Sequence, residues 1–291
     1  MEWQADWGLR GRMLVTMVLL GVLYVVAIAV LWELFTSVLI IVVFFGIFTF
    51  AQVFYSDKLA LKSMGAREVD ASEYPQLHRM TERLCQQADL PKPKIAVADS
   101  NVPNAFATGH SKDSSAVCVT TGLMNTLNDE ELEGVIAHEL AHIKNRDVMV
   151  MTIASFLSTI AFLMVRYGMF FGGRGRGGRG GAGILVAILV SLVIWVISFI
   201  LIRALSRYRE FSADRGGALI TGNPAALASA LRSIDDRMER TPETDMREQA
   251  EMNAFFIIPI KKGFIGKIAR THPQTEKRIE KLQELERELH T

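Results

Sequence analysis

Two histidines and a glutamate form the clearest chemical motif of the chain. His138 and His142 stand four residues apart, and Glu139 follows the first of them. On a helix, this spacing puts both imidazoles on one face, one turn apart, where they can share one zinc ion. Glu139 then lies where it can act as the general base toward a water on that metal. The alternative is a polar surface helix with incidental histidines, although the composition predicts only about 0.01 such matches by chance.

The segment around the motif has the pattern of a capped, half-buried helix. Asn128 is a favourable N-cap, and Glu131 can bond back to the N–H of the cap residue. The three acidic residues that follow Asn128 suit the positive end of the helix dipole. A stripe of apolar residues recurs at helical spacing and predicts one buried face: Leu132, Val135, Ile136, Leu140 and Ile143.

A catalytic zinc ion takes three protein ligands and keeps one position open. The third ligand should be a side chain on an element that can reach the motif helix. The sequence leaves several choices open, namely acids on a later helix and the histidines His78, His110, His272 and His290.

Glu210 and Asp214 are the acidic candidates that suit this task best. They are four residues apart and share a helix face. If Glu210 is the ligand, Asp214 can accept a hydrogen bond from a motif histidine and hold its tautomer. Small residues such as Gly217 would let their helix approach another helix closely. The alternative is a surface ion pair between Glu210 and a neighbouring arginine, which would contribute little.

The elements that position these residues include four long apolar runs. Half of the 291 residues are hydrophobic, and a net charge of +1 excludes a generally basic surface for nucleic acid. After an N-terminal cytoplasmic segment, residues 1–12, two transmembrane helices are expected within 13–55. The third and fourth apolar runs, with a Gly/Arg-rich loop, occupy residues 148–202. Each run is long enough to be a spanning candidate: Met13–Leu31, Leu34–Tyr55, Val148–Val165 and Ile184–Ile202.

Basic residues predict the orientation of the first hairpin. Arg10 and Arg12 precede its first run, and Lys58, Lys62 and Arg67 follow its second. The positive-inside rule therefore puts both ends of the hairpin in the cytoplasm. The arginines between the third and fourth runs oppose this rule, so an interfacial hairpin on anionic headgroups is the alternative to full spanning there.

The remaining segments predict an α+β, mostly helical fold. Residues 56–147 are expected to form the first half of the domain that carries the motif helix, and residues 203–291 are expected to form its second half. Helical periodicity over Glu73–Ala88 precedes short strands that form a small β-sheet. The last helix, Pro273–His290, is densely charged, and its charges are expected to face solvent.

The chain resembles the HtpX-like membrane metalloproteases of the M48 peptidase group, a gluzincin family. The resemblance rests on the apolar runs, Asn104–Phe106, His138–His142, Arg209–Asp214 and Thr271–Pro273. It implies a membrane-bound endopeptidase that holds one Zn²⁺ per chain through His138, His142 and Glu210. It further implies that the catalytic domain faces the cytoplasm and degrades damaged or misassembled membrane proteins.

The expected mechanism assigns Glu139 as the general base and His272 as a second group that stabilises the oxyanion. Asn104, Ala105 and Phe106 should form a strand edge on which an extended, unfolded polypeptide lies. The expected partners are polypeptides, including unfolded segments of membrane proteins, and the lipid bilayer, with no nucleic acid. Two alternatives remain: a Ste24-type prenyl-protein protease and a non-catalytic, zinc-stabilised membrane scaffold.

Overall fold

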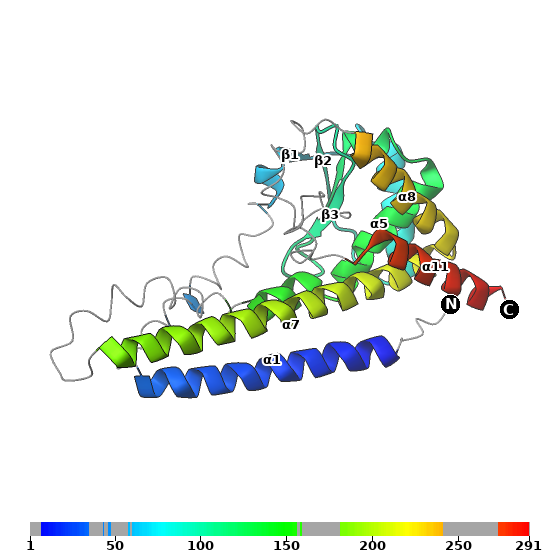
Figure 1. Ribbon diagram of the computed structural model, residues 1–291. Helices are drawn as coiled ribbons and strands as arrows, with labels where there is room; N and C mark the ends of the chain where they lie inside the picture. Colours follow the sequence, from blue (N-terminus) through cyan, green and yellow to red (C-terminus); the bar gives the residue numbers. More distant parts are fainter. Residues whose placement is uncertain are drawn as a thin grey trace. The chain divides into compact units, whose positions relative to one another are not determined.

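A computed structural model describes residues 7–34, 60–155, 181–240 and 273–290, together with residues 43, 46–47, 58 and 158. The chain divides into two compact units (Figure 1). One unit contains a small sheet and most of the helices, and the other contains the apolar helical segments. The elements in chain order are α1 (Trp7–Leu34), β1 (Ala66–Glu68), α3 (Pro75–Ala88), β2 (Lys94–Ala98), β3 (Ala105–Thr108), β4 (Ala116–Thr120), α4 (Thr121–Met124), α5 (Asp129–Lys144), α7 (Gly181–Thr221), α8 (Pro224–Arg240) and α11 (Thr275–Leu289).

The sheet is mixed, with the strand order β1-β2-β4-β3. β2 and β4 are parallel, and the two outer strands pair antiparallel to them. β4 is buried along its whole length, as its run of small and β-branched residues requires. β3 is the edge strand on the side of α5, and it becomes the important strand for the site.

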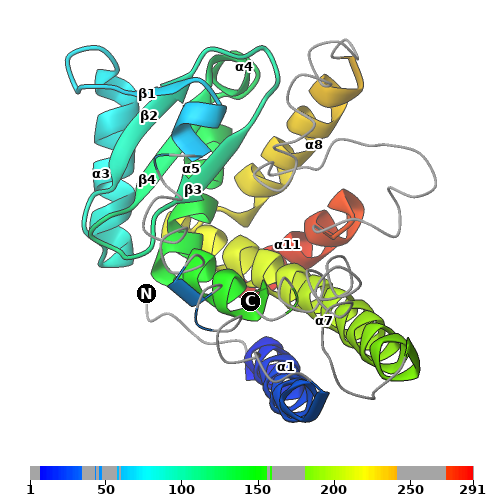
Figure 2. The same cartoon turned by 90° about the vertical axis from the view of Figure 1, so that its left-hand side faces the viewer.

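Helices α3 and α5 lie side by side on one face of this sheet (Figure 2). The sheet face and both helices share one hydrophobic core, to which α8 and α11 also contribute. A second, smaller cluster covers the opposite face of the sheet and includes Ala60, Met64, Phe106 and Cys118. Within the larger core, α5 packs against the sheet and against α8, so the motif helix is fixed on two sides.

The predicted cap of α5 is confirmed. The Asn128 side chain accepts a hydrogen bond from the N–H of Glu131, and the Glu131 carboxylate accepts one from the N–H of Asn128. Ser229 and Ser233 of α8 donate to the same carboxylate and satisfy it further. This network fixes the start of the motif helix, ten residues before its first histidine.

The second unit consists of apolar helical segments. Its core joins α1, residues 150–154 and the middle of α7 through Leu20, Tyr24, Ala154 and Leu205. Two helical stretches, Trp7–Val26 and Leu189–Thr221, are long and apolar enough to cross a membrane. Their outer faces expose large apolar side chains, as lipid-facing helices do: Leu14, Val18, Val22, Val25, Val193 and Ile200.

Some predicted boundaries were wrong. α1 begins at Trp7, before the apolar run, and it continues through the break that was expected at Trp32–Glu33. α3 begins at Pro75 rather than Glu73, because proline suits the first helical position. β1 was not predicted, since its three residues carry no alternating pattern. Most of the second apolar run and half of the third lie outside the described residues, as does the Gly/Arg-rich loop up to residue 180.

Candidate metal centre

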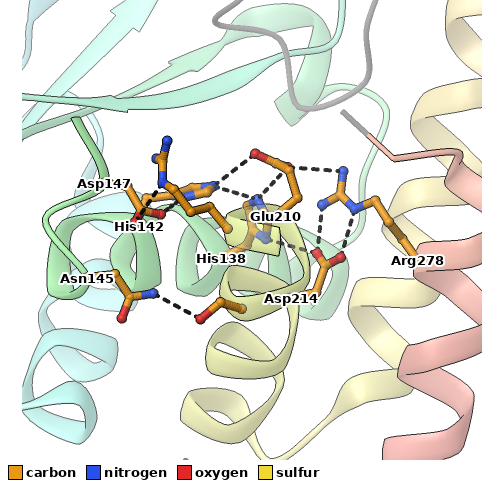
Figure 3. Close-up of polar contacts among 9 residues, drawn as sticks. His138, His142, Asn145, Asp147, Glu210, Asp214 and Arg278 are labelled. Atoms are coloured by element: carbon orange, nitrogen blue, oxygen red, sulfur yellow. Dashed lines mark hydrogen bonds and ion pairs between the residues drawn. The ribbon is translucent and has the colours of Figure 1, made fainter. Parts of the chain in front are cut away.

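Three side chains from α5 and α7 converge on one point. The Nε2 atoms of His138 and His142 are 3.1 Å apart. The carboxylate oxygens of Glu210 lie 3.8 Å from the first nitrogen and 3.6 Å from the second (Figure 3). Ligand atoms placed tetrahedrally at zinc distances stand roughly 3.3 Å from each other. These separations, measured to the two different oxygens of Glu210, are close to the size that a tetrahedral metal site needs, and the three residues form a metal-binding group.

Close packing of α7 against α5 brings Glu210 to the histidines. Gly217 faces the backbone of α5, where a Cβ atom would lie 2.7 Å from the nitrogen of His138 and 2.9 Å from its Cα. No side chain fits at that distance from a backbone. The sequence favoured a close approach at this glycine, and the structure shows that its missing side chain permits it.

Gly217→Ala should therefore separate α7 from α5. We expect the free energy of unfolding to fall by about 1–3 kcal/mol, as for other overpacked sites. Metal affinity should fall as well, because Glu210 moves with α7. Thermal unfolding and competition with a metal chelator measure the two effects. Gly21→Ala is the matched control, since its new Cβ would meet nothing within 4 Å. Unchanged unfolding and affinity in Gly217→Ala would contradict this packing argument.

Each motif histidine faces a carboxylate with its other ring nitrogen. Nδ1 of His138 lies 3.0 Å from Asp214, and Nδ1 of His142 lies 2.5 Å from Asp147. A carboxylate at Nδ1 favours the proton there, which leaves the Nε2 lone pairs directed toward Glu210. The contact of Asp214 is the one that the sequence suggested, whereas Asp147 was not anticipated.

Two arginines hold these carboxylates. Arg209 of α7 forms an ion pair of 2.9 Å with Asp147. Arg278 of α11 forms two hydrogen bonds to Asp214, of 2.8 and 2.7 Å. The guanidinium of Arg278 is buried, so the expectation that all charges of the last helix face solvent was wrong at this position. Glu210 is also buried, which excludes the alternative of a surface ion pair for its carboxylate.

The buried charges at the site favour a divalent cation. Four carboxylates face two guanidiniums, which leaves a formal charge of −2 when the histidines are neutral. Burying such an excess of negative charge without a compensating cation costs free energy. A dication placed between the three ligands would neutralise it. The groups counted are Glu139, Asp147, Glu210, Asp214, Arg209 and Arg278.

The pKa values report the same negative field. Burial lowers the pKa of His142, but the hydrogen bond with Asp147 and the charges of Glu210, Asp147 and Glu139 raise it to about 9. Burial raises the pKa of Asp147, but Arg209 and His142 bring it below its usual range. An environment that holds a proton on a buried imidazole attracts cations in general.

Glu139 is buried beside the metal-binding group. Burial raises the pKa of its carboxyl, and the charges of His138 and His142 offset part of this rise. A backbone hydrogen bond from Ala107 of β3 also lowers it. Glu139 thus lies between the metal-binding group and the edge strand.

The edge strand turns alternate backbone groups away from the sheet. The carbonyl of Asn104 accepts a hydrogen bond from the N–H of Thr120, so every second residue from Asn104 bonds toward β4. Ala105 and Ala107 therefore direct their N–H and C=O groups outward. The side chain of Phe106 is buried on the far face of the sheet.

A small, partly open cavity adjoins His142 at the end of β3. Thr108, His110 and Ser115 line one wall, and Ile143 and Arg146 line another. The cavity lies where the open edge of the strand approaches the metal-binding group.

The other candidate third ligands lie elsewhere or outside the described residues. Nε2 of His78 contacts the carbonyl of Val69 at 3.0 Å, and His290 is exposed near the end of α11. His110 interacts with Ser114 in the β3–β4 connection. His272 lies outside the described residues.

Comparison with known proteins identifies the family. The model of Peptidase family M48 matches residues 71–286. "Protease HtpX homolog 2" of Methanosarcina mazei is 55% identical over 290 residues, which are 99% of either chain. "Protease HtpX homolog" of Moorella thermoacetica is 48% identical over 98% of this chain and 97% of its own.

A solved structure shares the fold. The crystal structure of S. mikatae Ste24p aligns with a TM-score of 0.55 at 19% sequence identity. The match covers 90% of this chain but 62% of Ste24p, so this chain spans less than two thirds of that protein. The family match and the long apolar helices favour a membrane protease over the other readings of the sequence. The chain belongs to peptidase family M48, and it is a membrane-bound metalloprotease.

Proposed function

We propose that the chain is a zinc endopeptidase in which His138, His142 and Glu210 hold one Zn²⁺. The observation that carries this proposal is the convergence of the three side chains inside a buried site of negative charge: the two Nε2 atoms are 3.1 Å apart, and the two Glu210 oxygens lie 3.6 and 3.8 Å from them. Two imidazoles and one carboxylate form a donor set that suits catalytic zinc. A structural site would need a fourth protein ligand, and the described residues add none to this group.

Glu139 is the proposed general base. When bound, the zinc ion supplies a Lewis acid that polarises the peptide carbonyl and acidifies a water molecule. The Glu139 carboxylate accepts the proton of the attacking water and later passes it to the leaving amine. Its hydrogen bond from Ala107 fixes it beside the strand on which the substrate would lie. We further propose that His272 stabilises the developing oxyanion, although this residue lies outside the described ranges.

Asp147 and Asp214 are proposed to orient the two imidazoles. Each carboxylate lies at the Nδ1 atom of one ring and favours the tautomer that leaves Nε2 free to bind metal. Neither residue needs to touch the substrate for this task.

The proposed substrates are unfolded segments of polypeptides, above all of membrane proteins. An extended peptide can pair with the outward backbone groups of Ala105 and with the carbonyl of Ala107, as in strand addition, while the N–H of Ala107 donates to Glu139. Such pairing depends on main-chain hydrogen bonds and on few side chains of the substrate. The resulting low sequence specificity suits the removal of damaged or misfolded proteins in quality control. A folded helix offers no free backbone groups, so stably folded proteins should resist cleavage.

We place the catalytic unit on the cytoplasmic face of a multi-pass protein in the cell membrane. The basic residues Arg10 and Arg12 at the start of α1, together with Lys58, Lys62 and Arg67, support this orientation. A protease added to inside-out vesicles should digest the catalytic unit, and intact right-side-out vesicles should protect it. The reverse pattern would refute the orientation.

The function is tested by digestion of an unfolded protein with the detergent-solubilised full chain. We expect cleavage of unfolded casein, loss of at least about 10²-fold in rate with a zinc chelator, and recovery on adding Zn²⁺. A prenylated peptide in a parallel assay tests the prenyl-protein alternative. Cleavage of that peptide alone would favour that alternative, and no cleavage of either substrate would favour the scaffold.

A further inference from the structure

Arg278 connects the last described helix to the metal-binding group. It lies in the first turn of α11 and shares a face with Leu282 and Leu285, all three of which are buried. Its exposed fraction is 1%, the lowest of any charged residue that the structure describes. A guanidinium is rarely buried unless ion pairs and hydrogen bonds with its partners offset the cost of its desolvation.

The partners of Arg278 are the two carboxylates of α7. Nε and Nη2 donate to the two oxygens of Asp214 at 2.8 and 2.7 Å, which is a bidentate pair. Nη1 lies 3.7 Å from Oε2 of Glu210 (Figure 3). One planar group therefore spans a metal-binding carboxylate and the carboxylate that faces His138.

This arrangement addresses a physical problem of the site. Glu210 and Asp214 are one helical turn apart and buried, so their negative charges repel each other. Without a cation between them, each carboxylate could swing away from its histidine. The guanidinium of Arg278 gives Asp214 two hydrogen-bond donors and places its positive charge 3.7 Å from Glu210, and it does so from a helix that supplies no ligand.

We propose that Arg278 is a positioning residue of the metal site, which acts through Asp214 on the ring of His138 and directly on the carboxylate of Glu210. The inference rests on the zinc site proposed above. It makes α11 part of that site, so that docking of this helix sets the metal affinity. Lysine carries the same charge, but it cannot form the bidentate pair and reach the second carboxylate at once.

Positioning and charge neutralisation predict opposite effects on metal affinity. If Arg278 only neutralised charge, its removal would make the site more negative, and zinc would bind more tightly. If it positions the ligands, its removal should weaken binding in spite of the extra negative charge. Replacing a residue that forms a hydrogen bond with a metal ligand commonly lowers the metal affinity about 10- to 100-fold.

The test measures zinc affinity of the full, detergent-solubilised chain by competition with a chromophoric chelator. We expect Arg278→Met to bind zinc about 10- to 100-fold more weakly than wild type, and Arg278→Lys to lie between them. The visible spectrum of the cobalt-substituted protein should change in Arg278→Met, because it reports ligand geometry. Unchanged or tighter zinc binding, or an unchanged cobalt spectrum, would overturn the proposal.

Arg215→Met is the matched control. Arg215 forms an ion pair with Glu288 that joins the same two helices, but both side chains are partly exposed. This variant should keep the wild-type zinc affinity. An equal loss in Arg215→Met would show that any weakening of the contact between α7 and α11 lowers the affinity, and it would overturn a specific role for Arg278.

A double variant keeps the test decisive if Arg278→Met fails to fold. Asp214→Asn with Arg278→Met removes both charges of the buried pair, which proteins often tolerate. Because part of the action of Arg278 is proposed to pass through Asp214, the double variant should bind zinc more weakly than Asp214→Asn alone, but by less than the factor of about 10 to 100 expected for Arg278→Met in the wild-type background. If the double variant loses the full effect of both substitutions on zinc affinity, the proposed coupling between Arg278 and Asp214 is contradicted. The wild type separates the two proposals, since a wild type without zinc refutes the proposed function itself.

Discussion

Glu139→Gln should abolish peptide cleavage and leave zinc binding intact. The amide has the size of the carboxylate but cannot accept the proton of the attacking water. We expect kcat to fall by about 10²- to 10⁴-fold, which is the usual contribution of general acid–base catalysis. KM should change little, because Glu139 is not proposed to bind the substrate. Steady-state cleavage of an unfolded substrate and metal analysis of the same sample measure the two quantities.

Glu133→Gln is the control for this substitution. Glu133 lies on the same helix and forms a surface ion pair of 2.5 Å with Arg83. Its loss should leave kcat unchanged, since surface ion pairs contribute little. If Glu139→Gln cleaves at more than about a tenth of the wild-type rate, Glu139 is not the general base.

Glu210→Ala should lose the metal. One of three proposed ligands disappears, and the excess of negative charge that attracts a dication becomes smaller. The zinc affinity should fall by more than about 100-fold, since replacing a residue that only forms a hydrogen bond with a ligand already lowers the affinity about 10- to 100-fold. Chelator competition measures the affinity, and added zinc should restore little activity. Glu280→Ala, an exposed acid on α11, is the control.

Retention of stoichiometric zinc with normal affinity in Glu210→Ala would mean that another residue is the third ligand. His110, which lines the cavity beside His142, would then be the next candidate to replace.

Local patterns in the sequence predicted the parts of the site that lie on single helices. The cap at Asn128 and the two histidines depend on contacts within about one turn, so their spacing alone indicates their geometry. The same holds for the shared face of Glu210 and Asp214 on α7.

Contacts between elements distant in the chain were harder to predict. Arg278 was assigned to solvent, although it continues the stripe of Leu282 and Leu285 backward by one turn. A charged residue on an apolar stripe was the signal that could have identified it. Asp147 follows the helix end, where Arg146 adopts a left-handed φ of 56° and redirects the chain. The hydrophobic periodicity of the sequence does not predict a left-handed turn of this kind, so it could not place Asp147.

β1 shows a different limit. Its residues Ala66, Arg67 and Glu68 have no strand pattern, and pairing with β2 alone defines them as a strand. Tertiary context thus overrode local preference, as is common for short edge strands.

The central claim is that one zinc ion is held by His138, His142 and Glu210 with no sulfur ligand. X-ray absorption at the zinc edge of the zinc-loaded full chain tests it most directly. We predict one zinc per chain, two imidazoles and carboxylate oxygen at about 2.0–2.2 Å, and no scatterer at the zinc–sulfur distance of about 2.3 Å. A sulfur shell, a single imidazole, or a spectrum that Glu210→Ala leaves unchanged would contradict the account.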